Sequence, residues 1–305
     1  MLISTTKLAA FNNGIIITAT DAFQGAQNDA LINDLMMNTN ATGANVTLGW
    51  LGALPGMAQL RSETTKTGVR TSEYTVANYE WAQTLTVKAI DIHRDQLGVY
   101  KPTAQMLGVS GAMHPLELCA NALINGFTLT DYTGDTFFKT SGKKAWTGAT
   151  SFGNRMTKKL SADNFATGYA NLRNRKNAFG KPMRLGRRVA LVVSPTYEFT
   201  AKSIVSLQKL ASGADNPYYQ MAEVVVLQDL AISGTGDEWF LLEIGLPVKP
   251  LFKNEEIPFR VLSDTAMEGR DFIESHDFVW QGYYSGNVGY GLPELAYGST
   301  GVDAA

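Results

Sequence analysis

KPTAQMLGVSGAMHPLELCANALINGF, residues 101–127, carries the clearest helical pattern in the chain. Its larger apolar residues recur at alternating steps of three and four, which places them on one face of a helix. Pro115 cannot donate a backbone N–H, so we expect a kink or a break near His114, and Gly126 is a suitable stop. The pattern predicts a long amphipathic helix whose apolar stripe comprises Met106, Val109, Met113, Leu116, Ala120, Leu123 and Phe127.

Upstream of this helix, residues 46–90 predict a long β hairpin. Glycine and proline punctuate residues 49–56, and residues 64–68 (TTKTG) form a polar tip. The following stretch, EYTVANYEWAQTLTVKA (73–89), is dense in Tyr, Thr, Val and Trp, which favour strands. Such a hairpin has little of its own to bury, so we expect it to lie against a partner.

The two ends of the chain predict less regular structure. Residues 1–45 are rich in Asn, Thr and Ala, and they predict an arm with a helix near Gln27–Met37 that contributes little to a core. Residues 128–157 are rich in Gly, Thr and Lys and predict irregular structure, whereas residues 246–305 combine strands, glycine and aromatics.

A compact α/β unit is predicted over residues 158–245. Ser161 is a suitable N-cap for a helix that carries Phe165, Tyr169 and Leu172 on one face. Val189–Val193 is an apolar strand, and Ser194-Pro195 begins a helix that we expect to reach Ala211. Two further strands are expected at 223–227 and 239–244.

Composition and motifs argue against an enzyme. The 305 residues are 45% hydrophobic and 18% charged, as in folded proteins. The three histidines are isolated, and Cys119 is the only cysteine, so we expect no metal site and interpret Cys119 as a buried apolar residue. No nucleophile elbow or phosphate-binding loop occurs, so we expect no cofactor. The N-terminus MLISTTKLAA lacks the pattern of a secretory leader, and no apolar run is long enough to span a membrane.

The near-neutral total charge of −2 conceals two opposed blocks. Residues 155–188 hold ten Lys/Arg and one acid, whereas residues 223–294 hold thirteen acids and four Lys/Arg. The basic block could be a solvated helix face, could meet the acidic block of a neighbouring subunit, or could contact nucleic acid phosphates. The basic residues that we select as candidates are Arg173, Arg175, Lys176, Arg184, Arg187 and Arg188.

Several different short motifs follow one another along the chain, and together they resemble the major head subunit of Mu-like phages, the gpT family. The chain departs from the family after Phe138, where Lys139–Lys144 replaces an acidic stretch, and residues 1–45 match it poorly. The matching motifs are Gly49-Trp50-Leu51-Gly52 with Pro55, Tyr74-Thr75-Val76-Ala77-Asn78, Leu97-Gly98-Val99-Tyr100-Lys101-Pro102, His114-Pro115-Leu116-Glu117-Leu118, Asp131-Tyr132-Thr133-Gly134 with Phe137-Phe138, Lys249-Pro250-Leu251, and Gly289-Tyr290-Gly291-Leu292 with Leu295-Ala296-Tyr297-Gly298.

The resemblance implies an α+β fold of the Hong Kong 97 capsid type. It implies an N-terminal arm (1–45), an E-loop hairpin (46–90), a P-domain with a spine helix (91–157), an A-domain (158–245), and P-domain return strands with the C-terminal segment (246–305). The hairpin residues that we expect to contact other subunits are Trp50, Arg61, Lys66, Arg70, Tyr79 and Trp81.

The function implied by the resemblance is a major capsid protein. It would self-assemble in the host cytoplasm, as hexamers and pentamers, into the icosahedral shell of the virion around double-stranded DNA. Portal, scaffold and decoration proteins would be its partners. The alternatives are an encapsulin-like compartment with the same fold and a hydrolase with an unrecognised site.

Overall fold

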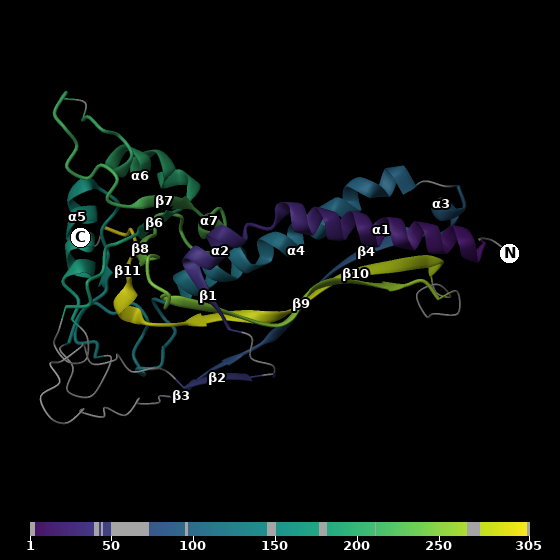
Figure 1. Ribbon diagram of the computed structural model, residues 1–305, viewed down its shortest axis with the longest axis horizontal. Coiled ribbons are helices and arrows are strands. Elements are labelled where there is room, and N and C mark those ends of the chain that lie inside the picture. Colours follow the sequence, from purple (N-terminus) through teal and green to yellow (C-terminus); the bar gives the residue numbers. More distant parts are fainter. Residues whose placement is uncertain are drawn as a thin grey trace, which may run out of the picture.

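The computed structural model is elongated, with an α/β unit at one end and two long helices over a narrow sheet at the other (Figure 1). It describes residues 4–39, 43, 45–49, 73–94, 97–144, 151–176, 182–210, 212–266 and 275–303. Trp50, Arg61, Lys66 and Arg70 therefore lie outside the described residues.

The predicted long helix is present as α4, Leu97–Asn125, and it ends immediately before Gly126 as expected. Pro115 does not break it, because the helix runs through both Pro102 and Pro115. The predicted apolar face is correct only in the C-terminal half, where Leu123 is fully buried. In the other half, Met106 is 70% and Met113 46% exposed.

The exposed methionines have a packing explanation, because the buried face of this half of α4 carries small residues. Ala104, Gly108 and Ala112 face the interior, where helix α1 (Thr5–Ala26) crosses closely. A Cβ atom added to Gly108 would lie 2.0 Å from the carbonyl oxygen of Ala19. The large apolar residues therefore predict the wrong buried face in this half of α4, because the close approach of the α1 backbone leaves room only for small side chains.

Helix α1 was not predicted, and it overturns the expectation that residues 1–45 contribute little to a core. Ser4 caps it by accepting a hydrogen bond from the Lys7 amide at 3.3 Å. The side chains that it buries belong to a cluster shared with α4 and the sheet, and they are Leu8, Phe11, Ile15 and Ala19. The helix predicted near Gln27–Met37 is present as the shorter α2 (Asp29–Leu35), which leads into strand β1 (Met36–Thr39).

The sheet beneath α1 and α4 has the order β1-β9-β10-β4. Strands β9 (Leu251–Asp264) and β10 (Asp277–Tyr290) form a long antiparallel ribbon, and β4 (Tyr79–Lys88) pairs with β10. The predicted hairpin is thus correct only in β2 (Asn45–Gly49) and β3 (Glu73–Ala77), which pair antiparallel. Asn78 fixes the passage from β3 to β4: its amide donates to Gly43 O and its oxygen accepts from Asn254.

The α/β unit is built on a sheet of order β5-β11-β8-β6-β7. Its helix α5 (Ala162–Arg173) begins at the predicted cap Ser161, and strand β6 has the predicted bounds, Val189–Val193. The other strands are β5 (Arg155–Met156), β7 (Glu223–Val226), β8 (Trp239–Glu243) and β11 (Ala296–Ser299). The short helices are α3 (Ala89–His93), α6 (Glu198–Val205), α7 (Leu230–Ser233), η1 (Pro195–Tyr197) and η2 (Pro293–Leu295).

The helix expected to reach Ala211 ends at Val205 because another side chain takes its carbonyl groups. The amide of Asn216 donates to Ile204 O at 2.7 Å and to Leu207 O at 2.8 Å. These bonds satisfy carbonyls that a continuing helix would have used, so the chain turns away after residue 205.

The two ends of the molecule share one core at their junction. Phe137 and Phe138 are fully buried there between α4, β8 and β10. The Phe137 ring stacks on Tyr290 with a centroid separation of 4.6 Å, and Tyr290 donates its hydroxyl hydrogen to Ala122 O at 2.9 Å. The junction is therefore continuous packing and not a linker.

Candidate functional site

The described part of the chain contains no cluster of side chains typical of a metal site or a catalytic site. No group of three or more His, Cys, Asp or Glu side chains there could hold a metal ion. Among the same residues, no helix has the length and apolar character needed to cross a membrane. Cys119 is fully buried, and burial raises the pKa of its thiol to about 12, which leaves it a poor nucleophile. The open surfaces of the molecule are therefore its candidate sites.

The two hairpin residues that the structure describes have different environments. Tyr79 is 56% exposed at the start of β4. Trp81 is half-buried: its Nε1 donates to Gly286 O at 3.1 Å, and its ring meets the His114 ring at a centroid distance of 4.6 Å. Trp81 therefore supports the packing of its own chain, whereas the more exposed Tyr79 ring meets the Trp81 ring at a centroid distance of 6.4 Å.

The basic block divides into three environments. Arg175 was expected on the surface, and this prediction is wrong. Its side chain is buried, with 4% exposed, and its guanidinium lies 4.4 Å from the Phe152 ring centroid. Arg188 is exposed but binds Glu223 and Asp34 of the same chain, with N–O distances of 2.8 and 3.1 Å. Of the six candidates, Lys176, Arg184 and Arg187 are exposed and form no ion pair with a described residue, while Arg173 lies over the Tyr169 ring.

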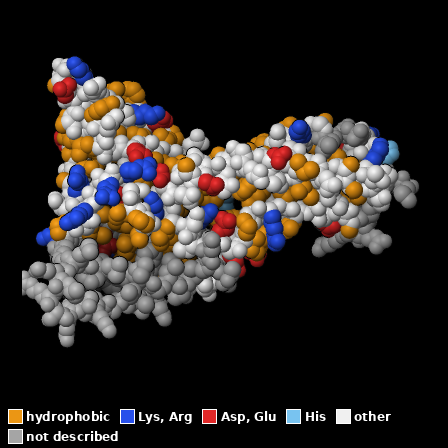
Figure 2. All heavy atoms as spheres, in the orientation of Figure 1, with side chains coloured by type: hydrophobic (Ala, Val, Ile, Leu, Met, Phe, Trp, Pro, Cys, Tyr) orange, Lys and Arg blue, Asp and Glu red, His pale blue; other side chains and the backbone are white. Residues whose placement is uncertain are grey.

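Figure 2 shows Lys and Arg side chains gathered on the α/β end of the molecule. The acidic block is less uniform than its sequence suggests. Glu243 is buried and accepts the Gly186 amide, and Glu238 accepts the amides of Thr235 and Gly236. These acids serve the fold of their own chain, so the two blocks do not face a partner as complete units.

A buried charged cluster lies at the junction, and the sequence did not identify it. Lys143 has no exposed surface, and its Nζ donates to Asp131 Oδ2 at 2.5 Å, Thr136 O at 2.6 Å and Phe137 O at 3.0 Å. Burial lowers the pKa of Lys143, an effect that the charge of Asp131 opposes. Glu294 is buried nearby, and burial raises the pKa of its carboxyl to about 7. Little in the sequence indicates the pair of Lys143 and Asp131. Asp131 lies in a family motif, but Lys143 lies in the stretch that departs from the family pattern.

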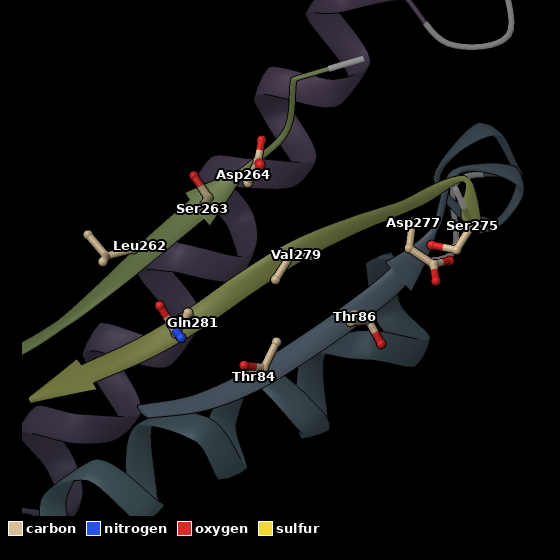
Figure 3. Close-up of a pocket in the computed structure, with 9 residues that line it drawn as sticks. All are labelled: Thr84, Thr86, Leu262, Ser263, Asp264, Ser275, Asp277, Val279 and Gln281. Atoms are coloured by element: carbon tan, nitrogen blue, oxygen red, sulfur yellow. The ribbon is translucent and has the colours of Figure 1, made fainter. Parts of the chain in front are cut away.

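One open surface is the outer face of the four-stranded sheet. Because side chains alternate along a strand, Leu85 and Val87 face α1 and α4, while Thr84 and Thr86 face outward. Figure 3 shows this outward face, a hollow of about 580 Å³ floored by threonine, Gln281 and Val279. Asp264 and Asp277 give it acidic character.

A second open surface is a smaller hollow of about 230 Å³ between α4 and the strands β4, β9 and β10. We call it the aromatic socket. Three of its walls are the rings of Trp81, Phe259 and Tyr284. Ser110 and Gln83 add polar groups, and Glu117 lies at its edge with a half-exposed carboxylate. The motif His114-Pro115-Leu116-Glu117 supplies this edge, with His114 Nδ1 3.0 Å from Glu117 Oε2.

Comparison with known proteins identifies relatives. The family model for the Mu-like prophage major head subunit gpT matches residues 8–156 and 146–230. The match begins at residue 8, so the N-terminal segment is more family-like than the sequence suggested. The chain is 34% identical over 118 residues to the major capsid protein of Escherichia phage Mu, and 34% identical over 100 residues to the Mu-like prophage FluMu major head subunit of Haemophilus influenzae. These matches cover 38% and 33% of this chain, and 39% and 32% of the relatives' lengths.

Solved structures agree in fold. The procapsid protein of bacteriophage JBD30 matches with a TM-score of 0.59 at 21% identity, over 98% of this chain and 76% of that one. A virus-like particle from Pyrococcus furiosus matches with a TM-score of 0.55 at 11% identity, over 93% of this chain and 97% of the other. The expected α+β fold of the Hong Kong 97 type is therefore confirmed. With more than half of its length matched by the family model, the chain belongs to the Mu-like prophage major head subunit gpT family.

Proposed function

We propose that this chain is the major capsid protein of a tailed phage, assembling in many copies into a closed shell. The observation that carries the proposal is the gpT family match across residues 8–230, in a chain whose fold follows a phage procapsid protein over 98% of its length. That family is named for a structural head subunit, which leaves the hydrolase alternative without support.

The shape of the molecule supports assembly. Within the described residues, the elongated end leaves one face of its sheet and one face of α4 uncovered, including Met106, Val109 and Met113. Large apolar side chains on a helix that is otherwise packed are typical of surfaces that meet another chain. Shell formation would supply that contact on both faces.

The finer parts of the proposal concern geometry and partners. Subunits would form hexamers and pentamers in the host cytoplasm, around double-stranded DNA, with portal, scaffold and decoration proteins. Residues 1–45, 91–157, 158–245 and 246–305 would keep the roles of arm, P-domain, A-domain and return strands. The E-loop role would fall to residues 45–77, because β4 belongs to the four-stranded sheet. Trp50, Arg61, Lys66, Arg70 and Tyr79 would contact other subunits.

Electron microscopy of the purified full-length chain tests the proposal. We expect closed particles of uniform diameter when protein concentration is raised, with or without a co-expressed scaffold. A chain that remains a small monomer at every protein and salt concentration, and with co-expressed neighbouring head genes, would contradict it.

An encapsulin-like compartment is the second candidate function, because the fold also matches the virus-like particle from Pyrococcus furiosus. The two functions differ in contents. Particles purified from the natural source should contain nuclease-protected DNA if the chain forms a phage head. A protein cargo held by a short peptide, with no protected DNA, would favour the compartment instead.

A further inference from the structure

We infer that the aromatic socket receives an arginine side chain, Arg184 or Arg187, from a second copy of this chain. The inference rests on the proposed function, since it names one contact through which subunits would join. It concerns a pocket on the described surface of α4 and the sheet, in which Trp81 is one of the walls.

The socket is built by the fold and not by chance exposure. The Phe259 ring lies over two glycines, since a Cβ added to Gly111 would be 2.3 Å and one added to Gly282 would be 2.9 Å from that ring. Phe259 also stacks on Phe23 of α1 with ring centroids 4.7 Å apart. On the opposite side, Trp81 is held by its bond to Gly286 O. These contacts fix aromatic walls around a hollow of about 230 Å³.

The charge at the edge of the socket selects a cation. Its described lining contains one carboxylate, Glu117, and no lysine or arginine. Asp229 lies close enough that the Glu117 charge, after burial, raises the pKa of the Asp229 carboxyl. Among the described residues Glu117 contacts the His114 imidazole, whose Nδ1 lies 3.0 Å from Oε2, and no lysine or arginine forms an ion pair with Glu117 or Asp229, so no permanent cation neutralises these two carboxylates.

Aromatic walls and a carboxylate together fit a guanidinium group. A planar guanidinium stacks on aromatic faces and can also donate two hydrogen bonds to one carboxylate, which a lysine ammonium does less well. The exposed methionines Met106 and Met113 lie on the same helix as Ser110 and Glu117, and they would cover the apolar stem of an incoming arginine.

A second copy is the occupant that the charges favour. Arg184 and Arg187 are exposed on the α/β end, with no ion pair among the described residues, whereas Arg175 and Arg188 are already engaged by their own chain. The donor and the acceptor thus lie on different ends of one elongated molecule. Such an arrangement is satisfied head to tail, with each copy giving one arginine and receiving one.

Filling the socket is the first test. Gln83 on β4 lines the socket, whereas Asn13 is exposed on α1 and lines neither of the two open surfaces. We expect Gln83→Trp to raise the protein concentration needed for particle formation at least about tenfold, measured by light scattering and electron microscopy. Asn13→Trp should change it less than about twofold. Equal effects of both variants, or none from Gln83→Trp, would overturn the inference.

Charge exchange is the second test. Glu117→Arg should impair assembly, as should the double variant R184E/R187E, and combining all three substitutions should restore assembly to within about threefold of wild type. Asp21→Arg, a reversal of an exposed acid on α1, is the control and should have little effect. Failure of the combined variant, with both parents folded by circular dichroism, would exclude Arg184 and Arg187 as the donors.

Wild-type protein run in parallel separates this inference from the proposed function. If wild type forms no particles, the shell function fails and the socket contact fails with it. If wild type and Gln83→Trp form particles alike, the shell function stands and only the socket contact is removed.

Discussion

The α/β end and the elongated end of the molecule bury their strands differently. Strands β6 and β8 are buried along their whole length, so both faces of that sheet are covered within the chain. Beyond residue 255, in contrast, β9 is largely open to solvent, and α4 exposes four large apolar side chains, Val99, Met106, Val109 and Met113. One end therefore completes its own core, whereas the other leaves faces for a second copy.

The buried pair at the junction should stabilise both ends together. Replacing Lys143 with Met leaves Asp131 buried without its cation, which costs about 3–5 kcal/mol of unfolding free energy. Lys144→Met, at the exposed neighbouring position, should cost less than about 0.5 kcal/mol. Chemical denaturation of the unassembled protein measures both. If only one end loses hydrogen-exchange protection in Lys143→Met, the two ends do not share the core at their junction.

Glu294 should make stability depend on pH. Burial raises the pKa of Glu294 from 4.5 to about 7, so the folded chain keeps a proton that the unfolded chain has lost. Its stabilising effect is complete below pH 4.5 and disappears as the pH rises through about 7, a loss on the order of 3 kcal/mol.

Thermal unfolding at a series of pH values compares wild type with Glu294→Gln, which cannot ionise. The stability difference between them should grow in favour of Glu294→Gln from pH 4.5 to 7. Glu198→Gln, at an exposed carboxylate, serves as the control. Parallel pH profiles of wild type and Glu294→Gln would show that Glu294 does not titrate in this range.

The helix pair of the elongated end should respond to a single methyl group. Gly108→Ala places a Cβ against the Ala19 carbonyl and should cost about 1–3 kcal/mol. Gly98→Ala, in the same helix with open space around it, should stabilise slightly because alanine favours helix. Hydrogen exchange should locate the loss in α1 and α4 and leave β6 and β8 protected. A loss spread evenly over both ends would mean that they unfold as one unit.

The same contrast explains which elements the sequence predicts. Val189–Val193 could be predicted to the residue because a strand buried on both faces reads as an unbroken apolar run. Helix α1 was missed although Leu8, Phe11, Ile15 and Ala19 fall at helical spacing, since alanine, asparagine and threonine between them hide the stripe. Strand β4 was assigned to a hairpin because local propensity cannot distinguish the first hairpin arm, which holds β2, from β10 as its partner.

The candidate site was less predictable than the fold for a related reason. The basic block could be counted from the sequence, but whether an arginine is free depends on distant residues. The Arg175 guanidinium packs on the Phe152 ring. The Arg188 guanidinium binds Asp34, which lies 154 positions away along the chain. The aromatic socket combines side chains from α4, β4, β9 and β10, and only His114 and Glu117 shared one motif.

The ion-pair cluster around Arg188 gives the smallest expected effect. It ties α2 of the N-terminal segment to strand β7, but the Arg188 side chain is 46% exposed, and exposed pairs contribute little. Arg188→Gln should therefore lower the unfolding free energy by less than about 1 kcal/mol, and 1 M salt should remove most of that difference. Arg187→Gln, at an exposed arginine with no described ion pair, should change stability still less. A loss as large as that from Lys143→Met would mean that the attachment of α2 to the α/β end depends on this cluster, because apolar packing there would then be too weak to hold it.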